Sequence, residues 1–292
     1  MMFGTTIAKK NAYAVLDAFL DVGGNFIDTS NNYAHWAGTG DESETLLGEW
    51  LNERKCRDKV VIATKVGFDR KGQGAGLRKE QIEYWIDESL RKLKTDYVDL
   101  YYAHTDDMSS PIEETAEAFH NLVQKGKVRL LGGSNYDTWR LFEFNSIAEK
   151  NGYTPYSVNQ QRYSYLYHQV DLVPNFIFNE PATRERLRYL ENKKIPLIAY
   201  SCLLQGTYDN PDRLPNGWIG GPRLDFIRQM AQKKGISASA LVVAWMANLG
   251  RLSGYPDVLP LFSSSRAEHL IDNCNSCDII LTDDEMTALN KA

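Results

Sequence analysis

Short runs of β-branched and aromatic residues alternate along the chain with longer stretches in which apolar residues recur every three or four positions. The first pattern is typical of buried strands and the second of amphipathic helices, so the alternation predicts a parallel sheet with crossover helices. The predicted strands span 26–30, 60–65, 98–104, 128–134, 156–160, 196–201 and 258–264. The predicted helices span 9–22, 42–54, 78–93, 112–124, 138–150, 183–192, 223–234, 237–248 and 266–274.

This order of elements predicts an α/β fold, a (β/α)8 barrel with one strand short of closure. Residues 1–5 look like the end of a strand that leads directly into the first helix, so we predict a truncated first strand. No composition break divides the chain, which favours a single domain over residues 1–292. The connections 161–181 and 202–221 are unusually long and follow predicted strands, so both are expected to overhang the C-terminal face of the barrel.

Two helix starts carry capping signals. Ser237 stands as the N-cap of the helix at 237–248. Asp41 precedes the helix at 42–54 with Glu44 three residues later, which is the spacing of a capping box.

The composition limits the kinds of partner. The chain is 43% hydrophobic, and its apolar runs fall short of the roughly 18 residues that a membrane span needs. A net charge of -5 with dispersed basic residues argues against nucleic acid and favours a small-molecule partner. The N-terminal residues lack the pattern of a signal peptide, so we expect the cytoplasm, where the four cysteines would be free thiols. Cys274 and Cys277 form a C-x-x-C without the second pair that a zinc site needs.

The candidate chemistry begins in the stretch 23–33, which reads GGNFIDTSNNY. Asp28 lies near the end of a predicted buried strand, and Tyr33 lies on the loop that follows. Lys65 ends the next strand, and a buried ammonium is costly unless a carboxylate pairs with it, so Asp28 is its natural counter-ion. That pair alone would fit a purely stabilising role, but His104 closes the third strand at the same edge. The four side chains are therefore predicted to meet.

These residue types suit proton delivery to an oxygen that develops negative charge. A tyrosine, with a pKa of about 10, is a weak acid near neutrality, and a nearby lysine cation lowers that pKa by stabilising the phenolate. Asp28 would hold Lys65 in place and charged. His104 would either polarise the substrate oxygen or help to relay the proton. None of these groups supplies a hydride.

The arrangement resembles the aldo-keto reductase family. Stretch 23–33 is similar to the first signature of the family, whose Asp, Tyr, Lys and His tetrad matches Asp28, Tyr33, Lys65 and His104. The resemblance implies a barrel that binds NAD(P)H, with NADPH favoured and NADH possible, and that reduces an aldehyde or ketone with Tyr33 as general acid. The cofactor contacts that it implies for the nicotinamide and pyrophosphate are Ser134, Asn135, Gln160, Tyr200, Ser201, Leu203 and Gln205.

The segment 261–273 occupies the place of the family's adenosine-phosphate site. Three hydroxyls and backbone N–H groups at a helix start, beside an arginine, make a ready anion site, although a plain serine N-cap is the alternative. The resemblance assigns to it Ser263, Ser264, Ser265, Arg266, His269, Asp272 and Asn273. Ser263 or Ser265 stands where many members carry a Lys or Arg for the 2′-phosphate, which keeps NADH open beside NADPH.

Two tryptophans are candidates for the substrate pocket. Trp36 follows Tyr33 on the same loop and is predicted to wall the pocket, whereas Trp218 lies in a Gly-rich loop that is predicted to be flexible and to close over it. Aromatic walls suit many carbonyl compounds, so the sequence selects no particular substrate.

Two other classes of function compete with an enzyme that reduces a small carbonyl compound. One is a cofactor-sensing regulatory subunit, like the potassium-channel β subunits on the same fold. The other is a metal-dependent barrel hydrolase, but the five histidines include no His-x-His or comparable ligand cluster. We therefore expect no metal, and we expect a monomer or a small homo-oligomer.

Overall fold

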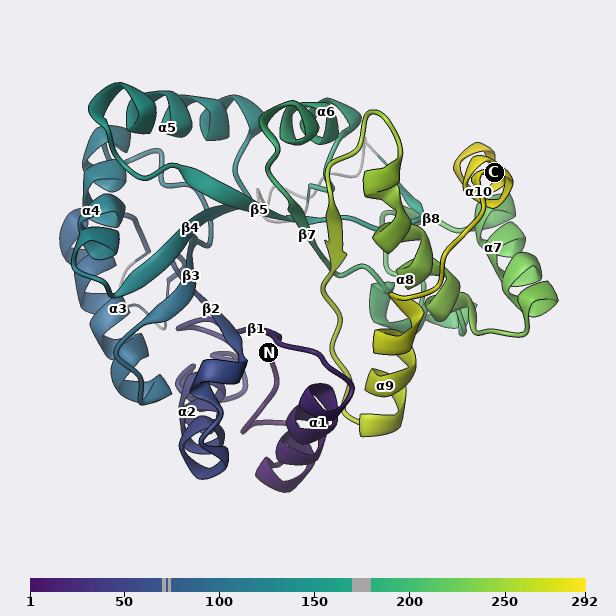
Figure 1. The fold of residues 1–292 in the computed structure, drawn as a ribbon, viewed down its shortest axis with the longest axis horizontal. Helices are drawn as coiled ribbons and strands as arrows, with labels where there is room; N and C mark the ends of the chain where they lie inside the picture. Colours follow the sequence, from purple (N-terminus) through teal and green to yellow (C-terminus); the bar gives the residue numbers. More distant parts are fainter. Residues whose placement is uncertain (70–71, 73–74, 170–179) are drawn as a thin grey trace. The chain divides into compact units, whose positions relative to one another are not determined.

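The computed structural model describes residues 1–69, 72, 75–169 and 180–292 (Figure 1). In the described residues, seven strands follow one another in one sheet. In sheet order they are β1 (Phe26–Asp28), β2 (Val61–Val66), β3 (Val98–Ala103), β4 (Val128–Ser134), β5 (Tyr156–Arg162), β7 (Leu197–Tyr200) and β9 (Val258–Pro260). The pairs β1–β2, β2–β3, β3–β4, β5–β7 and β7–β9 are parallel. The predicted strands are confirmed, although β9 ends four residues earlier than predicted, at Pro260, before the run of serines.

Helices separate successive strands, as predicted. They are α1 (Lys9–Asp21), α2 (Glu42–Arg54), α3 (Lys79–Leu93), α4 (Ile112–Gln124), α5 (Thr138–Asn151), α6 (Arg184–Lys193), α7 (Gly221–Lys234), α8 (Ala238–Asn248), α9 (Ala267–Ser276) and α10 (Asp283–Lys291). Helix α10 was not predicted, although Thr282 and Glu285 form a capping box at its start. Ser237 caps α8, as predicted, by accepting a hydrogen bond from the backbone of Ala240.

The contacts within the chain group it into two compact units. The first unit comprises Met1–Val158 with Ser265–Ala267, and the second comprises Asn159–Ser264 with Glu268–Ala292. Strands β1 to β4 belong to the first unit, and strands β7 and β9 belong to the second. A single domain over residues 1–292 stays a prediction.

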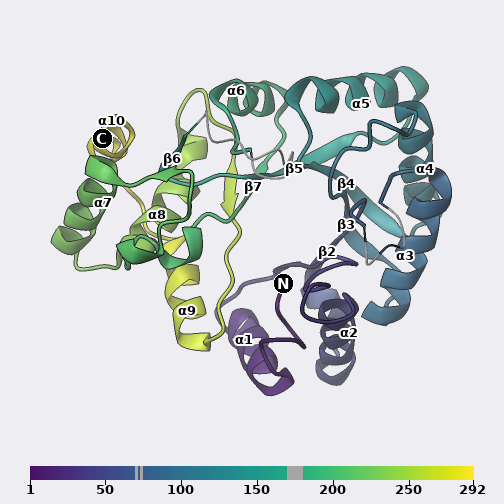
Figure 2. The same ribbon diagram turned by 180° about the vertical axis from the view of Figure 1, so that it is seen from behind.

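The first unit buries its strands between apolar layers. All six residues of β3 are buried, as expected for a parallel strand that is covered on both faces. Helices α3, α4 and α5 lie side by side along one face of β2, β3 and β4 in both views (Figure 1, Figure 2). Helices α2 and α3 approach so closely that a Cβ atom at Gly48 would lie 2.0 Å from the carbonyl oxygen of Lys92. This packing fixes the ends of β1, β2 and β3, which carry the candidate site.

The segment before α1 contains no full-length strand. Phe3 and Ile7 form an isolated bridge around a turn at 4–6. The residues expected to be the end of a strand form this bridge and turn instead.

The second unit contains an antiparallel pair that was not predicted. Strand β6 (Tyr167–His168) pairs with β8 (Trp218–Ile219), and together they join the two long connections. Of the connection 161–181, residues 170–179 lie outside the described part of the chain. Helix α8 is buried on nearly all sides in the core of this unit.

Candidate active site

Asp28, Tyr33 and Lys65 form a closed triangle of hydrogen bonds in the first unit. The Lys65 ammonium donates to Asp28 Oδ1 at 2.5 Å and to the Tyr33 hydroxyl at 2.7 Å. The Tyr33 hydroxyl donates in turn to Asp28 Oδ1 at 2.8 Å. The strand register explains the meeting, because Asp28 lies opposite Ala63, and Lys65 projects from the same face of β2 as Ala63, two residues further on. The predicted convergence of these three side chains is found in the structure.

Lys65 is fully buried, and three acceptors surround its ammonium. The third is the backbone oxygen of Thr29, at 2.6 Å, so each of the three ammonium protons has a partner. Burial lowers the pKa of Lys65 below its ordinary value, and the neighbouring Asp28 carboxylate opposes that fall. The carboxylate and the carbonyl therefore stabilise a cation directly beneath the Tyr33 hydroxyl.

Tyr33 is half-buried. It lies in the turn after β1, and Ala34, next in the chain, has a left-handed φ of 60°. The Lys65 nitrogen lies 4.5 Å from the centre of the Tyr33 ring. The ring of His104 meets the Tyr33 ring edge to face, with the centroids 5.9 Å apart. The arrangement keeps the Tyr33 phenol next to the Lys65 ammonium and the His104 ring, and it leaves part of Tyr33 accessible.

His104 follows β3 and is held by its backbone and its ring. Its N–H donates to the Val66 carbonyl at 2.7 Å, and its carbonyl accepts from the Asn135 amide at 2.9 Å. The ring lies 4.4 Å from the Phe68 ring, and Nδ1 lies 3.2 Å from the Ser30 hydroxyl. Burial, and secondarily the charge of Lys65, hold the pKa of His104 well below 6.5. The imidazole is therefore neutral at neutral pH.

A neutral His104 predicts a loss of stability in mild acid. The unfolded chain takes up a proton at this histidine near its ordinary pKa of 6.5, whereas the folded chain does not. The contribution of His104 to the free energy of unfolding is therefore complete above pH 6.5. It is lost as the pH falls from there towards the folded-state pKa, by up to about 1.4 kcal/mol per pH unit. Denaturant unfolding gives the free energy of unfolding at about pH 7.5 and about pH 5.5. Between these two values, that free energy should fall less for His104→Gln than for the unchanged protein. Equal losses would contradict a neutral His104.

The predicted nicotinamide contacts fall in both units. Ser134 ends β4 and is fully buried, and Asn135 beside it has a left-handed φ of 55° and contacts the Ser134 hydroxyl at 3.2 Å. Gln160 is buried in β5, and Tyr200 is half-buried at the end of β7. The first two residues lie in the first unit with the tetrad, and the other two lie in the second unit.

The segment after β7 contains several residues with a left-handed backbone conformation. Ser201, Leu204 and Gln205 all have left-handed φ values, of 54°, 45° and 58°. Such conformations are strained for residues other than glycine, and they cluster at ligand clamps. Ser201 and Gln205 are exposed and Leu203 is half-buried. The pyrophosphate role that the resemblance assigns to this segment stays a prediction.

The segment 263–266 leads directly into α9. Ser263, Ser265 and Arg266 are exposed and Ser264 is half-buried, so hydroxyls and a guanidinium stand at the start of a helix. His269 and Asp272 are exposed on the helix itself, with Asn273 half-buried beside them. The donor set suits a phosphate group, because helix starts carry unpaired N–H groups and a partial positive charge.

Comparison with known proteins identifies the family. The whole chain, residues 1–292, matches the sequence model of the aldo/keto reductase family. The chain belongs to this family. The expected resemblance is thereby confirmed, and with it the (β/α)8 barrel class and the assignment as an oxidoreductase enzyme.

Named relatives cover nearly the whole of this aldo-keto reductase. It is 31% identical to the aldo-keto reductase ausK of Aspergillus calidoustus, over 96% of this chain and 72% of that protein. It is 31% identical to norsolorinic acid reductase stcV of Emericella nidulans, over 96% of this chain and 71% of that protein. It is 29% identical to an aryl-alcohol dehydrogenase (NADP+) of Phanerodontia chrysosporium, over 98% of this chain and 76% of that protein.

The two tryptophans of the predicted substrate pocket differ in their surroundings. Trp36 is 60% exposed on the loop after Tyr33, with its ring against that of His35. Trp218 is 6% exposed in β8, packed edge to face on His168. The prediction that Trp218 lies in a flexible loop is wrong, because pairing with β6 and burial in the core hold it. Its role towards substrate stays a prediction.

Sequence reasoning missed a second buried ion pair behind the tetrad. Glu44 is fully buried and accepts hydrogen bonds from Thr64 at 2.6 Å and from Lys92 at 3.1 Å. Lys92 also lies 2.7 Å from Asp41, whose side chain does not cap α2. The predicted capping box at 41–44 is therefore wrong, and both acids instead tie the start of α2 to Lys92 near the end of α3.

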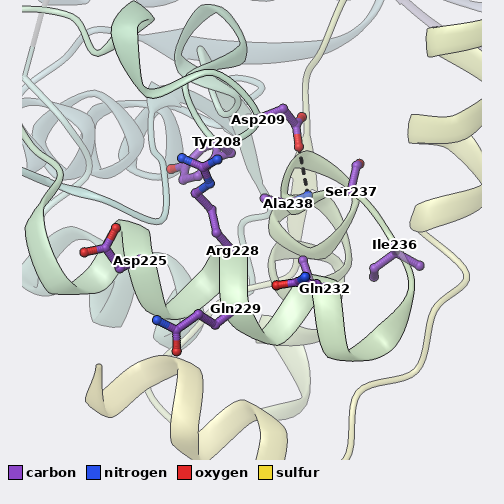
Figure 3. A pocket seen from close by; sticks show the side chains of 10 residues that line it. Tyr208, Asp209, Asp225, Arg228, Gln229, Gln232, Ile236, Ser237 and Ala238 are labelled. Carbon is purple, nitrogen blue, oxygen red and sulfur yellow. Dashed lines mark hydrogen bonds between the residues drawn. The ribbon is translucent and has the colours of Figure 1, made fainter.

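The pocket drawn in Figure 3 is separate from these residues and lies in the second unit. Its lining comes from α7, the start of α8 and the segment before them, including Arg228 and Gln232. The Asp209 carboxylate accepts from the backbone N–H of Ala238 at 2.9 Å and so occupies the start of α8 (Figure 3). Within the described ranges, its lining includes no residue predicted for the site.

Among the described residues, no group of three or more His, Cys, Asp or Glu side chains is placed to hold a metal ion. In the same part of the chain, no helix combines the length and the apolar character needed to cross a membrane.

Proposed function

We propose that this chain reduces an aldehyde or ketone to an alcohol with NADPH, and that Tyr33 gives the proton to the substrate oxygen. The observation that carries the proposal is the Tyr33 hydroxyl, which touches a buried ammonium at 2.7 Å and a carboxylate at 2.8 Å. The reductase and dehydrogenase names of the relatives support carbonyl and alcohol chemistry in general.

The tetrad would act on the substrate oxygen. When bound, reduced nicotinamide supplies a hydride to the carbonyl carbon, and the oxygen then needs a proton. Tyr33 gives that proton, and Lys65 stabilises the phenolate that remains. Asp28 and the Thr29 carbonyl hold the ammonium in place for this task. His104, being neutral, is left with two roles, as donor to the substrate oxygen or as acceptor in a proton relay.

The preference for NADPH rests on the segment 263–269. Arg266 and His269 are exposed near the start of α9, where they would attract a 2′-phosphate. The relative that is named for NADP+ supports the same cofactor. The serines at 263 and 265 carry no positive charge for the 2′-phosphate, as a lysine at either position would. The experiment therefore compares NADPH with NADH.

Binding and turnover should be measured separately. Fluorescence titrations with NADPH and with NADH give the two affinities, and steady-state oxidation of each with a panel of aryl and alkyl aldehydes gives turnover. We expect turnover with NADPH that exceeds turnover with NADH. Tight binding of cofactor without turnover of any aldehyde would overturn the proposal and favour a cofactor-sensing regulatory subunit. The cytoplasmic location and the monomeric or small oligomeric state stay predictions.

A further inference from the structure

We propose that Ser164 and Tyr208 are positioning residues that hold the segment 201–208 in the conformation that receives the diphosphate of the cofactor. The inference rests on the proposed function, because the segment meets a diphosphate only if the chain binds NADPH. Every residue that the proposal uses belongs to the second unit.

The Ser164 hydroxyl connects the two ends of the segment 201–208. Ser164 lies two residues after β5 and is buried. Its oxygen lies 2.6 Å from the carbonyl oxygen of Cys202, near the start of the segment, and 2.6 Å from the hydroxyl oxygen of Tyr208, at its end. The Tyr208 hydroxyl also lies 3.2 Å from the backbone nitrogen of Leu166. One buried hydroxyl therefore ties both ends of the segment to the chain after β5.

The backbone groups at the ends of this row of hydrogen bonds fix its direction. A carbonyl oxygen only accepts, so Ser164 donates its one proton to Cys202 and accepts from Tyr208. A backbone N–H only donates, so the Tyr208 oxygen accepts from Leu166 and keeps its own proton for Ser164. Burial raises the pKa of Tyr208, so the phenol stays protonated as a donor. Loss of either hydroxyl therefore leaves a buried partner without its hydrogen bond.

Within the segment, anchored residues alternate with residues that face solvent. Cys202 and Leu204 are buried in the core of the second unit, and the Cys202 thiol lies 3.4 Å from the carbonyl oxygen of Leu261. Ser201 and Gln205 are exposed, and both have a left-handed backbone. A left-handed backbone is strained for residues other than glycine and persists only where its surroundings hold it. The contacts of Ser164 are placed to do this.

The chain directly after the segment has an anchor of its own. The Asp209 carboxylate accepts from the backbone N–H of Ala238 at 2.9 Å, at the start of α8 (Figure 3). Removing the Tyr208 or Ser164 hydroxyl leaves this contact in place. The loss should therefore release the segment itself and leave α8 as it is.

A segment that is already in its binding conformation makes cofactor binding more favourable. The apparent dissociation constant equals the intrinsic one divided by the fraction of molecules in the binding conformation. Ordering a loop during binding also subtracts from the affinity. Breaking the contacts of Ser164 should lower that fraction in the cofactor-free protein and so weaken the binding of NADPH.

Hydrogen exchange in the cofactor-free protein tests the anchoring. Peptides that cover 201–206 should exchange faster in Tyr208→Phe and in Ser164→Ala than in the unchanged protein, and peptides from α8 should not. Tyr165→Phe is the matched control, because Tyr165 is also buried but donates to the Leu289 carbonyl of α10 at 2.9 Å. Unchanged exchange in Tyr208→Phe, or equal acceleration of 201–206 in Tyr165→Phe, would overturn the proposal.

Cofactor affinity tests the consequence. The dissociation constant for NADPH should rise about 2- to 10-fold in Tyr208→Phe, the range of one neutral hydrogen bond, and about 5- to 100-fold in Ser164→Ala, which breaks two. Because the two residues share one row of hydrogen bonds, the double variant should bind about as weakly as Ser164→Ala alone. Turnover at saturating NADPH should not fall, and Tyr165→Phe should keep the original affinity. Unchanged affinity in Ser164→Ala, or additive losses in the double variant, would contradict the proposal.

Adenosine 2′-phosphate shows where the effect acts. This ligand carries the 2′-phosphate but no diphosphate, so its affinity, measured by competition with NADPH, should be the same in Ser164→Ala as in the unchanged protein. A loss equal to that of NADPH would mean that the substitution damages the second unit in general, and the proposal would fall.

The two proposals can fail separately. A chain that binds NADPH through a Ser164-dependent segment but reduces no carbonyl compound would sink the proposed function alone. A reductase whose affinity for NADPH ignores Ser164 and Tyr208 would sink only this inference.

Discussion

Replacing Tyr33 with phenylalanine is expected to abolish carbonyl reduction and to leave cofactor binding nearly intact. A positioned general acid contributes about 10²- to 10⁴-fold to the rate, and the substitution removes the only proton that the phenol can give. Phenylalanine keeps the ring, which lies 4.5 Å from the Lys65 nitrogen and 5.9 Å from the His104 ring. The loss should therefore appear in kcat, and the dissociation constant for NADPH should change little. Steady-state turnover and a fluorescence titration measure the two quantities.

Tyr13 supplies a matched control for this substitution. Its hydroxyl donates to Glu53 at 3.0 Å, and the Lys9 nitrogen lies 5.0 Å from the centre of its ring. It therefore has the same kinds of partner as Tyr33, but on α1 and α2 rather than at the strand ends. Tyr13→Phe should keep full turnover. Turnover retained by Tyr33→Phe would remove that tyrosine from its proposed role.

The sequence was informative where buried parallel strands end in polar residues. Parallel strands covered on both faces read as apolar runs, so a charge such as Lys65 stands out in them. Because neighbouring parallel strands present their carboxyl ends at one edge, the meeting of Asp28, Tyr33 and Lys65 was predictable. The helices were also predictable, because apolar residues that recur every three or four positions can be recognised from a short stretch of sequence.

Features that depend on tertiary contact were missed. Trp218 was placed in a loop because its glycine neighbours suggested one, but pairing with Tyr167–His168, about fifty residues away, makes it part of a strand. Asp41 was placed as a helix cap from its spacing, but its side chain makes no cap hydrogen bond and instead lies 2.7 Å from the buried Lys92 nitrogen. The contact of Ser30 with His104 joins residues 74 positions apart, and no local pattern predicts it.

Removing the Lys65 ammonium should damage both stability and catalysis. Lys65→Met leaves the Asp28 carboxylate, whose side chain is 4% exposed, without its cation. Breaking a buried ion pair from one side costs about 3–5 kcal/mol, because the remaining charge stays desolvated. The same change removes the cation that stabilises the Tyr33 phenolate, so reduction should be lost as well. Denaturant unfolding gives the first effect, and turnover of the folded fraction gives the second.

A double substitution separates the two effects. In Lys65→Met with Asp28→Asn, no uncompensated charge stays buried, so much of the lost free energy of unfolding should return while turnover stays absent. Lys92→Met is the matched control, because Lys92 is 4% exposed and pairs with the buried Glu44. It should lower stability by a similar amount and leave the folded fraction active, since it contacts no member of the tetrad in the described residues. Recovery of turnover in the double variant would mean that the cation serves folding and not proton transfer.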